Sequence, residues 1–280
     1  MPLAAAVRGI GVPAEPGLYR LRRRSASLLA YIGQTGSGTM TLRKRMAMLR
    51  GVFGPEMPYR DPHTAGPALW AMRHQGHDDL EASFAVVAGD TPWRKGLEAV
   101  ALAEHRQGHR CSPSVNFGRM PKGYRMSSAN NALIVAAGRR FRGTVIDDDN
   151  PSHLAGVPPA GPLDRSVTAE DWCGHWWTSW RLATAALEEP RAGLYRLRGH
   201  GRQGLVYVGE GVIVDRVRAH VAKMRAPGHA QGRVLALVAP LEISWVEGTW
   251  EHHQRLELEN DLIAAHVLVE GRPPLAQFLG

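Results

Sequence analysis

Four tyrosines of the chain form two pairs with the same spacing. Tyr19 precedes Tyr31 by twelve positions, and Tyr195 precedes Tyr207 by the same interval. Arginines follow each pair, and a guanidinium fork matches the oxygens of a phosphate group. A phenol with a pKa of about 10 is a weak base at neutral pH, but it can orient a water molecule. These residue types favour chemistry at a phosphate group.

The tyrosine pairs belong to a repeated sequence. Residues 17–22 and 193–198 both read GLYRLR, and a Glu-Pro pair closely precedes each of them, Glu15-Pro16 and Glu189-Pro190. A second signal follows in each copy, Ala30-Tyr31-Ile32-Gly33 and Val206-Tyr207-Val208-Gly209. Because both the motif and its spacing are kept, we interpret the chain as a duplication.

Each copy predicts the same order of secondary structure. Short apolar and aromatic runs on either side of a polar or glycine-containing segment are typical of a β-hairpin. An apolar pattern at helical spacing follows, and then a strand-like run and a long helix. These elements are predicted at 18–21, 28–32, 42–49, 84–88 and 92–105, and again at 194–197, 205–208, 214–221, 241–246 and 252–268.

The elements predict an α+β protein with two domains, each a small three-stranded antiparallel sheet flanked by helices. Residues 147–162 are rich in Asp, Pro and Gly, a composition typical of a linker. We therefore expect a first domain with a basic C-terminal extension at 1–150, a linker with a tryptophan-rich segment at 151–185, and a second domain at 186–280.

Both copies resemble the GIY-YIG nuclease family, which is named after a Gly-Ile-Tyr and a Tyr-Ile-Gly triplet on two short strands. The corresponding triplets here are Gly17-Leu18-Tyr19, Tyr31-Ile32-Gly33, Gly193-Leu194-Tyr195 and Tyr207-Val208-Gly209. The resemblance covers residues 15–125 and 190–280. It implies two GIY-YIG domains in one chain and a Mg²⁺-dependent DNA endonuclease activity, with Mn²⁺ as a substitute cation.

The resemblance also implies the site residues. In the first copy, the helix arginine, the metal-binding glutamate and the late asparagine of the family correspond to Arg45, Glu98 and Asn116, beside Tyr19 and Tyr31. The matching residues of the second copy are Tyr195, Tyr207, Arg216, His220, Glu259 and Gln277, a longer amide in place of asparagine. The first tyrosine of each copy is expected to act as general base or to orient water, and the second to position phosphate or water.

Hydrolysis of a phosphodiester requires an activated water and an offset for the charge on the phosphoryl oxygens. Mg²⁺ binds through one or two carboxylates plus water and phosphate, which suits Glu98 and Glu259 as metal ligands. Glu104 and Glu257 are alternatives close by in the sequence, and each glutamate could instead be a solvated helix residue.

Two further clusters have more than one interpretation. Four of the eight tryptophans lie within 172–180, where they would pack on the second domain or offer a stacking surface for a base. His105, His109 and Cys111 could form part of a zinc site, although no further ligands are evident. The other cysteine, Cys173, makes no Cys-x-x-Cys motif with Cys111, which favours a reducing compartment.

The chain is basic, with 34 Lys and Arg against 26 Asp and Glu and a net charge of +8. This surplus favours a polyanionic partner, although a GC-rich genome would also enrich arginine. We expect double-stranded DNA, with specificity from loops at 50–80 and 118–125 or from the tryptophan-rich segment. Phosphate contacts are expected from Arg43, Lys44, Arg119, Lys122, Arg125 and Arg218. No signal peptide or membrane helix is evident, so a cytoplasmic protein without membrane contact is expected.

Two sites in one chain would cut both strands of a duplex without dimerisation. The leading interpretation is a restriction-like endonuclease that acts as a monomer. A structure-selective repair or recombination nuclease would instead use one copy to cut and the other to hold DNA. A non-catalytic DNA-binding protein would keep the fold for phosphate contacts alone.

Overall fold

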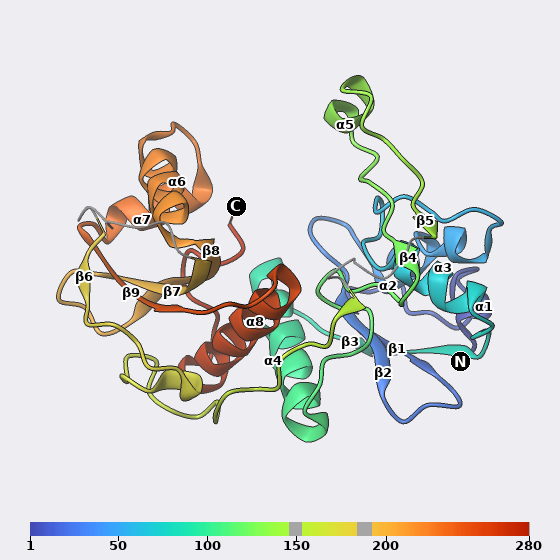
Figure 1. Ribbon diagram of the computed structural model, residues 1–280, viewed down its shortest axis with the longest axis horizontal. Coiled ribbons are helices and arrows are strands. Elements are labelled where there is room, and N and C mark those ends of the chain that lie inside the picture. Colours follow the sequence, from blue (N-terminus) through green and yellow to red (C-terminus); the bar gives the residue numbers. More distant parts are fainter. Residues whose placement is uncertain (146–152, 184–191, 280) are drawn as a thin grey trace. The chain divides into compact units, whose positions relative to one another are not determined.

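The computed structural model describes residues 1–145, 153–183 and 192–279 and shows a mixed α+β chain with two larger antiparallel sheets (Figure 1). The Glu189-Pro190 pair before the second repeat and residues 147–152 of the expected linker lie outside the described residues. Within the described residues, no helix is long and apolar enough to cross a membrane.

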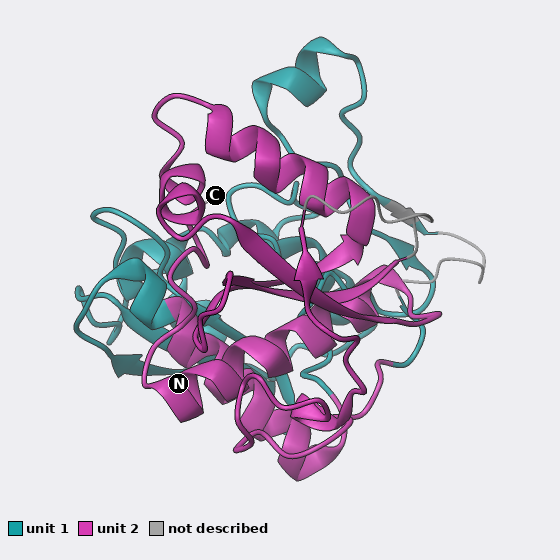
Figure 2. Ribbon diagram, turned by 90° about the vertical axis from the view of Figure 1, so that its left-hand side faces the viewer, with its two compact units in different colours: residues 1–94, 112–155 teal, residues 95–111, 156–280 magenta. Residues whose placement is uncertain are grey.

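The chain forms two compact units, which are coloured separately in Figure 2. Unit 1 comprises residues 1–94 and 112–155, and unit 2 comprises residues 95–111 and 156–280. This division differs from the expected ranges 1–150, 151–185 and 186–280, because residues 95–111 and the segment after residue 155 pack in unit 2.

Unit 1 contains a three-stranded sheet in the order β2-β1-β3. β1 (Gly17–Arg23) pairs antiparallel with β2 (Leu29–Gln34) and β3 (Leu80–Val86), which confirms the predicted hairpin and moves the third strand toward the N-terminus. Buried and more exposed residues alternate along β1, as expected for a strand with one face on the core. The other elements of unit 1 are α1 (Leu3–Ala6), α2 (Leu42–Ala47), η1 (Arg50–Phe53), α3 (Gly66–His74), β4 (Tyr124–Arg125), α5 (Ala132–Ala136) and β5 (Thr144–Val145).

The segment 50–80, expected to be a loop, contains η1 and α3. α3 has a proline in its first turn, where the missing N–H costs nothing, and its apolar residues are buried in the core of unit 1. Burial of Leu69 and Met72 in the core stabilises the helix.

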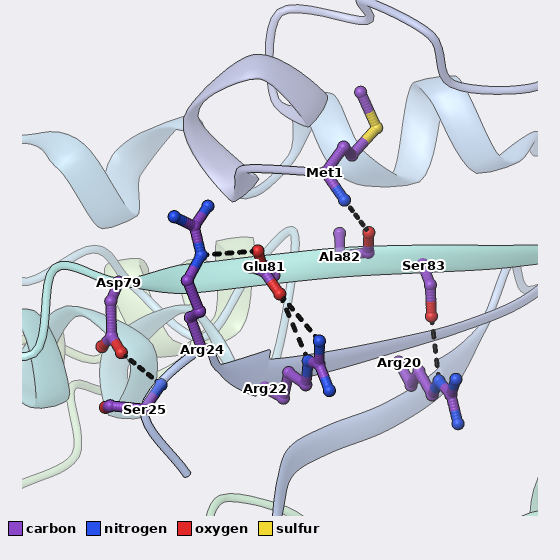
Figure 3. A network of polar contacts seen from close by, with 9 residues as sticks. All are labelled: Met1, Arg20, Arg22, Arg24, Ser25, Asp79, Glu81, Ala82 and Ser83. Atoms are coloured by element: carbon purple, nitrogen blue, oxygen red, sulfur yellow. Dashed lines mark hydrogen bonds and ion pairs between the residues drawn. The ribbon is translucent and has the colours of Figure 1, made fainter.

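Charged side chains lie on the exposed face of the unit 1 sheet (Figure 3). Arg22 and Arg24 pair with Glu81 on β3 at 3.1 and 2.9 Å. Arg20 Nε donates to Ser83 Oγ at 2.9 Å. The arginines of the GLYRLR repeat in this unit therefore form exposed cross-strand contacts, which contribute little to stability.

Unit 2 contains a four-stranded sheet in the order β6-β9-β7-β8, one strand more than expected. β7 (Ala192–Gly199) pairs antiparallel with β8 (Leu205–Val212) and β9 (Leu241–Glu247). The additional strand, β6 (Arg181–Leu182), is a two-residue exposed edge strand, too short to produce a periodic sequence pattern. The elements of unit 2 that follow residue 155, besides the strands, are η3 (Trp172–Gly174), α6 (Ile213–Arg225), α7 (Ala230–Leu237) and α8 (His252–Glu270).

One long helix, α4 (Thr91–His109), begins in unit 1 and continues in unit 2 from Lys95. There it packs antiparallel against α8, with Asn260 Nδ2 donating to Ala99 O at 3.0 Å. Arg106, fully buried, pairs with Asp261 at 2.9 Å and with Glu257 at 3.3 Å. The helix that follows the first repeat in sequence therefore completes the core of unit 2.

The tryptophan-rich segment packs on the sheet of unit 2, which agrees with the first of its two interpretations, packing on the second domain. Trp172 and Trp177 are buried, and the guanidinium group of Arg196 lies 4.5 Å from the ring of Trp177 and 4.9 Å from that of Trp180. Trp176 differs, because it is 79% exposed. Within this segment, Trp176 is the tryptophan that keeps a free face for stacking.

Candidate active site

The paired tyrosines lie side by side on each hairpin. The ring centroids of Tyr19 and Tyr31 are 5.9 Å apart and their planes are tilted by 34°. Those of Tyr195 and Tyr207 are also 5.9 Å apart, with a tilt of 33°. All four rings are buried. The repeat in sequence is therefore a repeat in geometry.

The last glycine of each hairpin motif leaves room for these rings. A Cβ atom on Gly33 would lie 2.6 Å from the hydroxyl of Tyr19, and one on Gly209 would lie 2.5 Å from the hydroxyl of Tyr195. Such distances are far below van der Waals contact, so a larger residue would displace a tyrosine. The close approach explains why glycine stands at this position in both copies.

A histidine contacts the first tyrosine in each unit. His220 on α6 has its Nε2 atom 2.8 Å from the hydroxyl of Tyr195. His63 has its Nε2 atom 2.6 Å from the hydroxyl of Tyr19. His220 was predicted from its place one turn after the helix arginine, whereas His63 was missed.

The two histidines reach equivalent positions from different parts of the chain. In unit 1 the residue one turn after Arg45 is Leu49, which is buried in the core and supplies no polar group. His63 comes instead from the segment before α3, where Arg45 Nη1 donates to Pro62 O at 3.2 Å. The absence of a histidine at position 49 was the signal that could have prompted a search for another donor.

The hydrogen bonds of His63 determine its tautomer. Nδ1 accepts a hydrogen bond from the backbone N–H of Ala65 at 3.2 Å, so Nε2 carries the proton and donates it to the Tyr19 oxygen. Burial, reinforced by the nearby charge of Arg45, holds the pKa of His63 well below its usual value, so the ring is neutral. A donor at the phenol oxygen stabilises a phenolate and leaves the phenolic proton available to another acceptor.

In unit 2 the arginine and the glutamate join the tyrosines. Arg216 Nε on α6 lies 3.4 Å from the hydroxyl of Tyr195. Burial raises the pKa of Tyr195 well above its usual value and also raises that of Tyr207, and the charge of Glu259 adds to both while Arg216 opposes it. Both phenols are therefore protonated at neutral pH, because burial outweighs the lowering expected from the arginine.

Glu259 is the carboxylate of this cluster. Burial, followed by the neighbouring carboxylate of Glu210, raises the pKa of Glu259 to about 8, and Arg216 opposes this shift. Glu210, at the end of β8, is held by Arg255 Nε at 2.9 Å. A carboxylate beside a second carboxylate suits a hard divalent cation, which would offset their repulsion. That Glu259 binds Mg²⁺ stays a prediction.

Glu98 lies on α4, in the part of the helix that belongs to unit 2, whereas Tyr19, Tyr31 and Arg45 belong to unit 1. Arg94, one turn before Glu98, donates from Nη2 to Gly36 O at 3.0 Å, in the loop after β2. That Glu98 joins the site of the first copy stays a prediction.

The two alternative glutamates have other surroundings. Glu257 is fully buried, pairs with Arg106 and accepts the backbone N–H of Val157 at 2.8 Å. It is therefore a structural partner of α4. Glu104 is exposed on α4. Because Glu257 is already paired in the core, Glu259 remains the predicted ligand of unit 2.

The predicted amides contact strand backbones. Asn116 Oδ1 accepts the N–H of Ile32 at 2.9 Å, and Asn116 Nδ2 donates to Ile32 O at 2.8 Å. Gln277 Oε1 accepts the N–H of Val208 at 3.2 Å. Ile32 and Val208 are the middle residues of equivalent triplets, so Gln277 reaches the position that Asn116 occupies. Both amides therefore hold the middle residue of the second triplet in place, and a catalytic role for either stays a prediction.

The predicted DNA contacts are all at least partly exposed: Arg43, Lys44, Arg119, Lys122, Arg125 and Arg218. Arg43 Nε and Lys44 Nζ also donate to the backbone oxygens of Val12 and Thr39. The contacts of these six residues with DNA stay predictions.

Of the three residues suggested for a zinc site, two histidines lie side by side. The centroids of His105 and His109 are 4.5 Å apart. Residues 1–145, 153–183 and 192–279 contain no group of three or more His, Cys, Asp or Glu arranged to hold a metal ion.

Comparison of the chain with protein-family models, with curated proteins and with solved structures gave no match.

Proposed function

We propose that the chain is a metal-dependent endodeoxyribonuclease with two domains of the GIY-YIG type. The observation that supports this most strongly is the repeated cluster of two tyrosines, a histidine on the first hydroxyl and a nearby arginine. Core packing alone would not require a histidine at the same hydroxyl from two unrelated chain positions. A shared chemical requirement at that oxygen explains it.

In this proposal Arg45 and Arg216 bind the phosphoryl oxygens of the scissile group. The first tyrosine and its histidine orient the attacking water, and the second tyrosine positions the phosphate. Glu98 and Glu259 would hold Mg²⁺, which when bound supplies positive charge at the phosphoryl oxygens. The buried tyrosines and the histidine keep the reacting water in a fixed geometry, which lowers the entropic part of the barrier.

The substrate of this activity is double-stranded DNA, cut once by each site of a monomer. The basic charge of +8 supports a polyanionic substrate. The two sites differ in the chain segment that supplies the histidine and in the amide, which is Asn116 in the first copy and Gln277 in the second. This difference supports a second candidate function, in which one site cuts DNA and the other holds it.

Cleavage of supercoiled plasmid tests the proposal. The full-length chain should produce nicked and linear DNA with Mg²⁺ and none with EDTA. Glu98→Gln and Glu259→Gln should each convert the linear product to nicked circles, whereas Glu104→Gln and Glu270→Gln, on the same two helices, should change nothing. Loss of all cleavage from one variant and none from the other would establish divided roles. DNA binding without cleavage under any divalent cation would refute the nuclease and favour a DNA-binding protein.

A further inference from the structure

A long arm projects from unit 1 and carries an apolar helix at its tip. Residues 126–143, here called the arm, leave unit 1 after β4 and return before β5, with α5 at the far end (Figures 1 and 2). None of the residues of α5 is buried. Leu133 is 80% exposed and Val135 is 44% exposed.

An exposed run of Ala, Leu, Ile and Val is unfavourable in water, so the tip of the arm is expected to have a partner. The charge beside it indicates which kind. Residues 119–143 contain six Lys and Arg and no Asp or Glu. Arg139, Arg140 and Arg142 lie on the returning segment of the arm and are exposed, and Arg142 pairs with Glu56 at 3.3 Å. An apolar tip on a basic stem complements a polyanion with an apolar interior.

The base of the arm is hydrogen-bonded to the segment that carries His63. Arg60 N donates to Ser128 O at 3.2 Å, and Asn130 N donates to Asp61 Oδ2 at 2.8 Å. His63, two residues after Asp61, contacts Tyr19. The base of the arm therefore lies beside the segment that carries His63.

We propose that the arm binds duplex DNA, with Arg139 and Arg140 on the phosphates and Leu133, the more exposed apolar residue of α5, inserted into a base step from the minor groove. Apolar wedges of this kind partly unstack a step and bend the duplex, while basic side chains on either side offset the cost. The inference rests on the proposed nuclease function and adds to it a means of engaging DNA beside unit 1.

Binding of a fluorescent duplex to the full-length chain in EDTA tests the arm without cleavage. Arg139→Ala/Arg140→Ala should weaken binding at least tenfold, and should lower the salt slope by up to about 1.8, since each phosphate contact contributes ~0.9. Leu133→Ser should abolish the fluorescence increase of a 2-aminopurine placed in the duplex. Because α5 buries nothing, these variants should fold, which circular dichroism would check. Arg22→Ala/Arg24→Ala, on the exposed sheet face in Figure 3, is the matched charge control and should bind nearly as the wild type.

The possible outcomes distinguish a failure of the arm proposal from a failure of the proposed nuclease function. If the wild type binds and cuts DNA but the arm variants keep its affinity, salt slope and 2-aminopurine signal, the arm proposal is wrong and the nuclease stands. If the Ser variant instead abolishes self-association measured by sedimentation and leaves DNA binding intact, the tip binds a second copy and the proposal is overturned. If the wild type neither binds nor cuts DNA, both proposals fail.

Discussion

The hydroxyls of Tyr19 and Tyr195 each meet a histidine nitrogen within 2.8 Å, and the two histidines come from different places in the chain. In unit 1 His63 is the donor of this hydrogen bond, because its Nδ1 atom already accepts the N–H of Ala65 and the proton of the ring is on Nε2. The phenol oxygen therefore receives a proton donor and is prepared to carry negative charge. Sequence spacing could not reveal His63, since 44 residues separate it from Tyr19.

Replacement of His63 tests this role. In a Glu259→Gln background, which silences unit 2, His63→Ala should slow plasmid nicking by about 100-fold, the lower end of typical general acid–base effects. His63→Gln keeps an N–H donor and should recover part of the rate. His77→Ala in the same unit should have no effect. An unchanged nicking rate in a folded His63→Ala variant would show that the bond has no catalytic role.

The glycine of the second triplet makes a prediction about stability. Gly209→Ala would place a Cβ atom 2.5 Å from the hydroxyl of Tyr195, so overpacking should lower the free energy of unfolding by about 1–3 kcal/mol and displace the ring. Urea denaturation and near-ultraviolet circular dichroism would measure both effects. Gly204→Ala is the control, because a Cβ atom there meets nothing within 4 Å. Equal unfolding free energies for the two variants would contradict this account.

At the scale of elements, α4 and α8 are joined by a buried group of ion pairs in unit 2. Arg106 is fully buried between Glu257 and Asp261. Removing one partner of a buried ion pair leaves an uncompensated charge, so Arg106→Ala should destabilise the chain by about 3–5 kcal/mol in urea denaturation. Arg110→Ala, four residues later and exposed, should cost little. A loss below 1 kcal/mol for Arg106→Ala would mean that the carboxylates are protonated or hydrated without it.

The hairpins could be predicted from sequence because Tyr, Leu and Gly at fixed spacing report a local structure. The helices at 252–268 and 92–105 also agree with α8 and α4. Elements held by distant contacts could not be predicted in this way: α3 depends on burial of Leu69, and β6 on pairing with β9. The placement of α4 in unit 2 depends on Asn260 and Asp261, which lie over 150 residues away.

For the molecule as a whole, buried neutral histidines make stability depend on pH. Burial lowers the pKa of His175 to about 4, and its ring lies edge-on to Trp177 and Trp250. Because the unfolded chain binds this proton near pH 6.5, stability is full above that pH and is lost as the pH falls toward 4. The loss from this one group is about 3 kcal/mol, at 1.36 kcal/mol per pKa unit.

His175→Phe keeps an aromatic ring and removes the proton. The free energy of unfolding of the variant relative to the wild type should therefore rise by about 3 kcal/mol between pH 7 and pH 4 in urea titrations. The comparison is needed because the raised pKa of Glu259 acts in the opposite direction from pH 4.5 to 8. Parallel pH profiles for the two proteins would show that His175 takes up its proton without unfolding.

The passage of α4 from the first repeat into unit 2 limits how the chain can be divided. A fragment beginning at residue 186 would contain the second repeat and its site residues but lack Ala99, Ala103 and Arg106. The apolar side of α8 would then face water, and Glu257 and Asp261 would lose their shared cation. Under the proposed nuclease function, an enzyme that cuts one strand should therefore be made by silencing one site in the intact chain, because shortening the polypeptide removes a helix that the remaining half needs to fold.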